Sequence, residues 1–202
     1  MAKLDPLPKG MAKTLVGQMA GLSALAAPAV LVPAPPKGKT AGAKGKPKKA
    51  APSKLKESFA ICMATVDQVF NPPADPATVF QSTGRWYHLI RSGGKLTQYA
   101  QSSEAKGFDG GGTPALTQMG AAHNGADVEA AIDCVEKEFQ GDDQIVRWLE
   151  IPAYYVTALI VLAGKQAHAV LVSQPPAFTH LKKNAAYTLK EFFKQLAKET
   201  HT

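Results

Sequence analysis

Aromatic residues and cysteines are missing from the first 58 residues of this 202-residue chain. All fifteen aromatic side chains and both cysteines, Cys62 and Cys134, lie at or after Phe59. A segment rich in Ala, Gly, Pro and Lys that lacks aromatic residues buries too little apolar surface to offset the entropy cost of ordering it. We therefore predict a disordered leader and basic tail over residues 1–52, and a single folded domain over residues 53–202.

Acidic residues are missing from the lysine run, residues 37–56. Residues 1–56 hold eleven lysines and one acid, Asp5, for a net charge of +10, whereas residues 57–202 carry −3. Lysines on an extended chain bind phosphate backbones without reading bases, and this binding weakens with salt. We therefore assign binding of nucleic acid or another anionic surface to the run, with a soluble spacer as the competing interpretation. The candidate binding residues are Lys37, Lys39, Lys44, Lys46, Lys48, Lys49, Lys54 and Lys56.

Charge is absent from residues 14–36, and this apolar stretch has three interpretations. A signal peptide cleaved near residue 26 fits the lysines before it, and would make the protein secreted or periplasmic. A membrane span fits its length. Four prolines and the lysine run that follows disfavour both, because positive charge after an apolar segment stays cytoplasmic. We favour a disordered leader in a cytoplasmic protein, with a helical face that folds on a partner: Met11, Leu15, Met19, Leu22 and Ala26.

Catalytic and metal-binding motifs are also absent. The sequence has no GxSxG, HExxH or GxxxxGK[ST] motif, and no two histidines have the helical spacing of metal ligands. The two cysteines lie outside any CxxC pair, so we interpret them as buried reduced thiols. We predict no cofactor, no metal ligand and no catalytic residue, and lean against an enzyme. An enzyme hypothesis remains for the glycine-rich loop over residues 105–125, with His123 near Asp127 as a base.

Residues 53–102 contain one helical pattern and one hairpin pattern. Apolar residues from Leu55 to Phe70 recur at spacings of four, three, four and four, which predicts a helix, while residues 58–66 also suit a strand. Two β-rich runs flank Ser92-Gly93-Gly94 and predict a tight hairpin. We assign its aromatic residues, Trp86, Tyr87 and Tyr99, to the core and not to base stacking.

Residues 127–202 read as a helix, three strands and a final helix. The helix is predicted over residues 127–140, and the strands over residues 144–152, 153–163 and 166–176, with Gly164 in the last turn. Thr188 and Glu191 predict a capping box at the start of the last helix, with Tyr187 packed against Phe192.

The predicted order, α-β-β-α-β-β-β-α, gives an α+β fold with a mainly antiparallel sheet of about five strands covered by helices. This order resembles that of the roadblock/longin folds, whose members mostly scaffold, dimerise and bind small GTPases or complexes. The resemblance lies in element order alone, and the loop over residues 105–125 is an insertion that such a fold does not need. We therefore expect a non-enzymatic binding or scaffolding module. Its domain engages a protein partner, its tail attaches to nucleic acid or another polyanion, a homodimer is compatible with the resemblance, and no membrane partner is expected.

Overall fold

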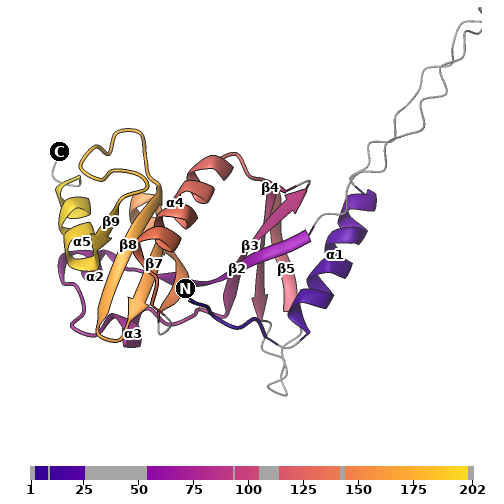
Figure 1. The fold of residues 1–202 in the computed structure, drawn as a ribbon, viewed down its shortest axis with the longest axis horizontal. Coiled ribbons are helices and arrows are strands. Elements are labelled where there is room, and N and C mark those ends of the chain that lie inside the picture. The colour runs from indigo at the N-terminus through magenta and orange to yellow at the C-terminus, as the bar shows by residue number, and fades with distance from the viewer. Residues whose placement is uncertain are drawn as a thin grey trace, which may run out of the picture.

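One largely antiparallel sheet organises the molecule (Figure 1). The computed structural model describes residues 3–8, 10–25, 54–92, 94–104, 114–141 and 144–199. Within these residues nine strands form the sheet, in the order β5-β4-β3-β2-β6-β7-β8-β9, and β1 pairs with β6 outside this path. The strands are β1 (Lys3–Leu4), β2 (Lys54–Met63), β3 (Arg85–Ser92), β4 (Lys95–Glu104), β5 (Pro114–Ala121), β6 (Ile145–Ile151), β7 (Val156–Ala163), β8 (Gln166–Ser173) and β9 (Ala186–Thr188). The helices are α1 (Met11–Leu25), α2 (Val66–Phe70), α3 (Pro76–Val79), α4 (Gly125–Glu138), the 3-10 turn η1 (Pro152–Tyr154) and α5 (Leu189–Lys198).

Strand β2 divides the sheet into two half-sheets because it changes neighbours along its length. Residues 54–60 pair antiparallel with β3, whereas Ile61–Met63 pair in parallel with β6. We call β2–β5 the N-terminal half-sheet and β6–β9 the C-terminal half-sheet. The short strand β1 also pairs in parallel with β6, at Ile145 and Val146. Two segments far apart in the sequence therefore pair with β6.

Helices cover both faces of each half-sheet. On one face α4 packs over both halves, where its Val128 and Val135 join a buried cluster with Tyr87 of β3 and Leu159 of β7. On the opposite face α2, α3 and α5 cover the C-terminal half-sheet around the fully buried Phe193. Among the described residues, α1 is the helix that covers the same face of the N-terminal half-sheet.

The N-terminal helix α1 belongs to the core. Its Met11, Leu15 and Met19 lie four residues apart and are 0%, 0% and 7% exposed. This spacing places them on one helical face, against β2–β5. The Gln18 Oε1 atom accepts a hydrogen bond of 3.0 Å from the backbone N–H of Leu116 in β5. Because β5 is an edge strand, α1 satisfies one of its unpaired backbone groups.

The expectation of a disordered leader does not describe residues 3–8 and 10–25. Three of the apolar residues predicted to fold on a partner pack instead on the chain's own sheet. Residues 26–53 lie outside the described residues. The boundary between tail and domain at residue 52 stays a prediction.

Residues 54–63 form β2, so the helix that we preferred over Leu55–Phe70 was wrong there. The competing strand interpretation of residues 58–66 is confirmed for residues 58–63. The physical reason lies in the burial of β2 on both faces: Phe59 and Ile61 contact the core under α4, whereas Ala60 and Cys62 lie on the opposite face. A strand segment covered on both sides is apolar at nearly every position. Apolar residues therefore also occur at the spacings of three and four that are expected of a helix face. Of the predicted helix, the part that is helical is Val66–Phe70, which forms α2.

The predicted loop over residues 105–125 contains strand β5, which pairs antiparallel with β4. Its sequence has few β-branched or aromatic residues, so local propensity gave no signal for a strand. Gly120 makes the pairing possible, because a Cβ there would lie 3.0 Å from the Tyr99 Cε1 atom. The sheet is thus larger than the five strands expected, and the predicted element order, with its resemblance to the roadblock/longin folds, fails at β2 and β5.

The remaining elements agree with their predictions. The hairpin β3–β4 turns at Gly94, whose φ is +83°, and β6, β7 and β8 are successive antiparallel strands. Helix α4 begins two residues before its predicted start. At α5 the Thr188 hydroxyl accepts a hydrogen bond from the backbone N–H of Glu191, which is one half of the predicted capping box, whereas the Glu191 side chain accepts a hydrogen bond from Gln195. Tyr187 lies 6.3 Å from Phe192 between ring centroids. The α+β class and the largely antiparallel sheet are therefore confirmed.

Candidate functional site

The eight lysines predicted to bind anions fall in two parts of the chain. Lys54 and Lys56 lie in β2, where the backbone of Lys54 pairs with Arg91 of β3. They therefore belong to the sheet and not to the tail. The other six, from Lys37 to Lys49, lie outside the described residues. Anion binding by these lysines stays a prediction.

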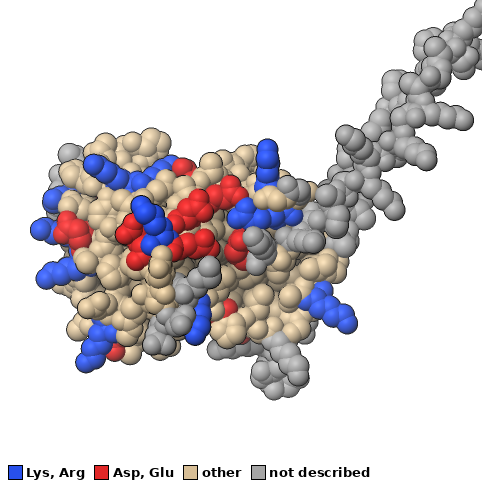
Figure 2. Space-filling view, in the orientation of Figure 1, with Lys and Arg blue, Asp and Glu red and all other residues tan. Residues whose placement is uncertain are grey.

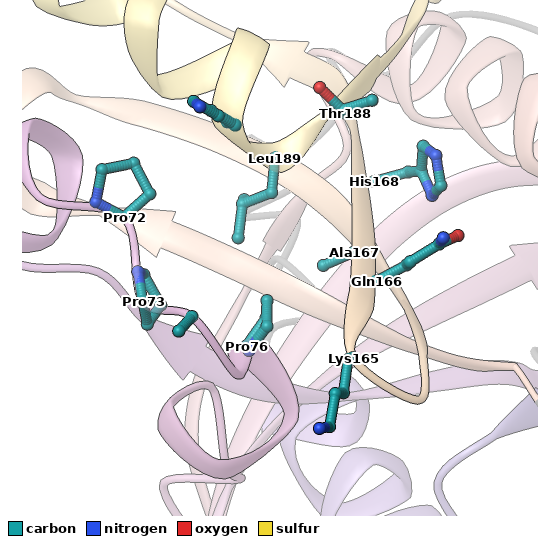
Figure 3. A pocket seen from close by; sticks show the side chains of 11 residues that line it. Pro72, Pro73, Pro76, Lys165, Gln166, Ala167, His168, Thr188 and Leu189 are labelled. Atoms are coloured by element: carbon teal, nitrogen blue, oxygen red, sulfur yellow. The ribbon is translucent and has the colours of Figure 1, made fainter.

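A surface groove lies between the α2–α3 connection and the start of α5 (Figure 3). The groove consists of two hollows, and the larger of them has a volume of about 500 Å³. Pro72, Pro73 and Pro76 line it on one side, and Ala167 and Leu189 line the other. Since proline, alanine and leucine side chains offer no hydrogen-bonding groups, this floor suits apolar side chains of a ligand.

A second hollow of about 260 Å³ adjoins the first, and the two share Pro72 and Lys190. It is lined by Val69 and Phe70 of α2 and extends along α5 to Lys194. We call the two hollows together the α5 groove. Phe70 is 45% exposed, which is unusual for a side chain of its size. A large apolar side chain at the edge of a groove is a common feature of binding surfaces.

Positive charge borders the α5 groove. Lys165, Lys190 and Lys194 line it and are exposed, and its lining residues include no Asp or Glu. Figure 2 shows basic side chains at the end of the molecule where α5 lies, with a smaller acidic cluster among them, and most of the acidic side chains over the middle of the same face, where α4 lies. The positive charge next to the groove therefore comes from the lysines that line it.

The polar side chains of β8 point away from the groove. Gln166 and His168 project to the other side of β8 from Ala167 (Figure 3). The His168 ring lies 5.0 Å from the Phe139 ring, and burial lowers its pKa. Its buried Nδ1 atom has no hydrogen-bond partner. His168 is therefore neutral at pH 7, and the groove takes its charge from the lysines.

A smaller apolar cavity of about 170 Å³ lies where β2 leaves β6. Leu4, Phe59 and Val146 line it, and Glu57 and Glu136 are its charged lining residues. Glu57 is already engaged by Arg91, at 3.4 Å between Oε2 and Nε. This cavity is a packing defect at the division between the half-sheets and a weaker candidate than the α5 groove.

A buried hydrogen-bonded network crosses three strands of the N-terminal half-sheet. His88 Nδ1 lies 2.9 Å from Ser58 Oγ, and His88 Nε2 lies 2.7 Å from Ser102 Oγ. These distances suit a serine nucleophile and its base. However, Ser58, His88 and Ser102 are 6%, 0% and 0% exposed, and Ser102 contacts Met11 of α1. A substrate does not reach them while α1 is packed, so their evident role is to satisfy one another within the core.

Burial lowers the pKa of His88 to about 4. The ring is therefore neutral at pH 7, with one nitrogen donating to a serine oxygen and the other accepting from a serine hydroxyl. Met11 packs against the network, and none of the three residues that compose it carries a formal charge at neutral pH. Protonation of His88 would place an uncompensated charge in the core, so the network couples the packing of α1 to pH.

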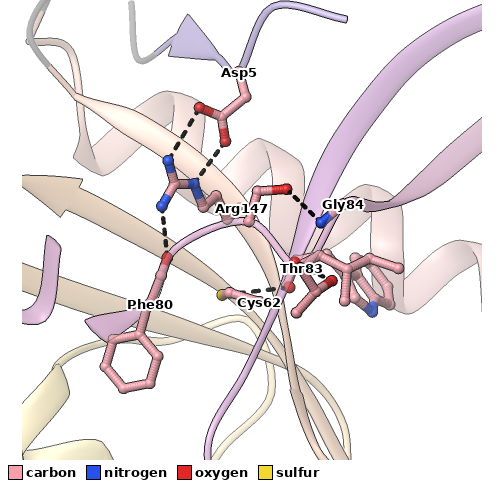
Figure 4. A network of polar contacts seen from close by, with 9 residues as sticks. Asp5, Cys62, Phe80, Thr83, Gly84 and Arg147 are labelled. Carbon is pink, nitrogen blue, oxygen red and sulfur yellow. Dashed lines mark hydrogen bonds and ion pairs between the residues drawn. The ribbon is translucent and has the colours of Figure 1, made fainter. Parts of the chain in front are cut away.

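The N-terminal segment is held to the sheet by an ion pair (Figure 4). Arg147 of β6 donates to both carboxylate oxygens of Asp5, at 2.6 Å and 3.2 Å. It also donates to the backbone carbonyl oxygen of Phe80, at 2.5 Å. Arg147 and Asp5 are 13% and 16% exposed in their side chains. Such a bidentate, half-buried pair fixes both the position and the direction of the segment that leads into α1.

His123, Asp127 and the two cysteines are not brought together at one place in the structure. His123 is exposed in the turn before α4, whereas Cys134 is partly buried within α4, about 15 Å further along the helix at 1.5 Å per residue. Asp127 pairs with Lys183, at 2.7 Å, and not with His123. Burial raises the pKa of the Cys134 thiol, and that of Cys62 to about 12, so both stay protonated at neutral pH.

Two of the three aromatic residues of the hairpin lie in the core, as predicted: Trp86 and Tyr87 are 3% and 6% exposed. Tyr99 is partly buried and packs against the core. The Tyr87 ring stacks between those of Tyr99 and Trp148, at centroid distances of 5.3 Å and 4.0 Å. Their faces are therefore not available to nucleic-acid bases.

Searches for other kinds of site and for relatives give negative results. Among the described residues no group of three or more His, Cys, Asp or Glu side chains is placed to hold a metal ion. Within the same ranges no helix has the length and apolarity to cross a membrane. Comparison of the chain with protein-family models, curated proteins and solved structures finds no match.

Proposed function

We propose that the protein is a non-enzymatic binding module that joins a protein partner to a polyanion. The folded domain engages the partner, and the lysine run attaches the assembly to nucleic acid or another anionic surface. The α5 groove carries the first half of this proposal, because it combines an apolar floor with exposed lysines. The charge of the run, eight lysines without an acid over residues 37–56, carries the second half.

The two activities belong to separate parts of the chain. The six lysines between Lys37 and Lys49 account for +6 of the chain's net charge of +7, so the rest of the chain, which includes the folded domain, is nearly neutral and offers a polyanion little attraction. The hairpin aromatic rings are stacked within the core and leave no stacking platform on that surface. We infer that nucleic acid is bound through phosphate contacts by the run, without preference for sequence.

The free thiols Cys62 and Cys134 support a reducing compartment. We propose the cytoplasm as the place where the module acts.

A salt series on the intact protein tests the polyanion half. Deleting the leader would also remove α1 and expose the sheet face that it covers. The better variant keeps every element and replaces Lys37, Lys39, Lys44, Lys46, Lys48 and Lys49 by Gln. We expect the wild type to bind labelled duplex DNA and RNA with a log–log salt slope of about −0.9 per phosphate contact on B-DNA, and the variant to lose most of that slope. Equal binding by the two proteins, or no binding by the wild type at physiological salt, would refute attachment by the run.

A further inference from the structure

The α5 groove has a lining that selects among protein partners. We propose that it binds a short segment of a partner protein that carries apolar side chains together with several carboxylates. This inference rests on the proposed function, because it names the chemistry of the partner that the domain engages. The argument depends on the shape of the groove, its floor and the sign of the charge along its border.

The shape of the groove suits a peptide. Its two hollows, of about 500 Å³ and 260 Å³, meet at Pro72 and Lys190 and together form an elongated site. Their volumes are comparable to those of ligand sites in proteins, about 300–1,000 Å³. An extended or helical segment therefore has two successive places for side chains, one beside Leu189 and one beside Phe70.

The floor favours apolar side chains over bases or sugars. Prolines and Leu189 present carbon surface in the larger hollow, and Val69 and Phe70 do so in the smaller one. Burial of such surface supplies the main driving force of most protein association. The lining of the groove has no pair of aromatic rings between which a base could stack.

The charge on the border specifies acidic residues on the partner. Lys165 lies at one end of the groove, Lys190 at the junction of the hollows and Lys194 along α5, and no acid lines either hollow. Three acids on or beside the same elements lie outside the lining. Asp67 accepts a hydrogen bond from Asn71 and Glu191 accepts one from Gln195, whereas Asp75 lies between the lining residues Ala74 and Pro76 with its Oδ1 atom buried. Complementary charge of this kind sets which partner binds and speeds its association.

The same charge argues against the chain's own leader as the occupant. Residues 1–56 carry +10 and would be repelled by three lysines. A second copy of the domain has an acidic α4, so self-association is an alternative that the experiment must separate. The separate acidic segment is favoured because the floor requires apolar side chains beside the carboxylates, whereas the apolar residues of α4 face its own core.

The test is selection of peptides by the full-length protein from a phage-displayed library of random 16-residue sequences. Three proteins are compared: the wild type, K165E/K190E/K194E, and the control K95E/K137E/K182E. The control makes the same change of net charge at exposed lysines outside the groove. The single variant K190E serves if the triple variant does not fold, since Lys190 lines both hollows.

We expect the wild type to enrich peptides with two or more Asp or Glu residues near Leu, Ile or Phe. A fluorescein-labelled peptide of the enriched sequence should bind at least about tenfold more weakly to the groove variant, and within about twofold of wild type to the control. Amide shifts on titration should centre on residues 69–76, 165–167 and 188–194.

Three results would overturn the inference: enrichment without acidic residues, equal affinity for the groove variant, or sedimentation showing that the wild type self-associates through the groove. Each can be told apart from failure of the polyanion proposal, because the groove variant keeps the lysine run. If binding to duplex DNA shows the expected salt slope while peptide selection fails, the proposal for the α5 groove is refuted and the proposal for the lysine run is kept.

Discussion

The two half-sheets of this protein are stabilised in different ways. The C-terminal half-sheet is covered by α5, which follows it in sequence, and by α2 and α3, which come from the segment between β2 and β3. The buried side chains of its core are almost all hydrocarbon. The N-terminal half-sheet is covered on one face by α1, which is separated in sequence from β2 by residues 26–53, and it buries Ser58, His88 and Ser102. The C-terminal half-sheet thus depends mainly on apolar packing, whereas the N-terminal half-sheet depends also on a neutral histidine and on a helix that precedes it by a long segment of chain.

The largest effect is expected in the C-terminal half-sheet. Phe193 is fully buried among aliphatic residues and lies 5.9 Å from Phe192 and 6.1 Å from Phe80 between ring centroids. Phe193→Ala should lower the free energy of unfolding by about 3–5 kcal/mol, because the cavity cannot collapse in a core packed from several elements. Urea denaturation measures the change. Phe70→Ala, at a residue that is 45% exposed, is the control and should cost far less.

An intermediate effect is expected from acid in the N-terminal half-sheet. Burial lowers the pKa of His88 to about 4, against about 6.5 in the unfolded chain. Below pH 6.5 the unfolded state therefore binds more protons, so stability is full above that pH and falls as the pH drops toward 4. The expected loss between pH 7.5 and pH 5 is about 2 kcal/mol.

Urea unfolding of the wild type and of S58A/H88L/S102A at both pH values measures this loss. The variant replaces the whole network by apolar groups and should lose the His88 share of the pH dependence. Hydrogen exchange should show that acid loosens α1 and β2–β4 before β7 and β8. If acid raised hydrogen exchange equally in the two half-sheets, the proposed difference in how they are stabilised would be wrong.

The smallest effect is expected for α1. Leu15→Ala removes a fully buried side chain, yet the cost should be only about 1–2 kcal/mol. The reason is that α1 can leave the sheet as a unit, so the loss is limited to its free energy of docking. Amide exchange should rise in α1 and in the Leu116 region, with little change in β6–β8. A loss as large as that of Phe193→Ala would show that α1 is as integral as the other helices.

Elements with a local signal were predictable from the sequence. The β3–β4 hairpin is set by Ser92-Gly93-Gly94, and α5 by the cap at Thr188, so neighbouring residues suffice to define them. Strand β5 was missed and β2 was assigned to a helix in preference to a strand, because their conformations depend on partners: β2 is buried on both faces over residues 59–62, and β5 relies on pairing with β4.

The candidate site was less predictable than the fold. The α5 groove joins residues near positions 70, 166 and 190, which no short window of sequence brings together. The exposed lysines of α5 were visible in the sequence, but nothing local distinguishes them from an ordinary solvated helix face. The lysine run, in contrast, was evident from composition, although the part of it that reaches Lys54 enters a strand.

The change of neighbours along β2 also bears on how the chain folds. The pairing of Ile61 with Trp148 joins positions 87 residues apart, whereas the hairpins β3–β4 and β7–β8 close through turns of a few residues. Contacts between distant positions slow folding because the entropy of loop closure must be overcome first. The hairpins should therefore form early and the β2–β6 junction late, so that a nascent chain exposes the edge of β2 until β6 has been synthesised. During that interval residues 59–63 of β2, which are all apolar, form the segment most exposed to aggregation.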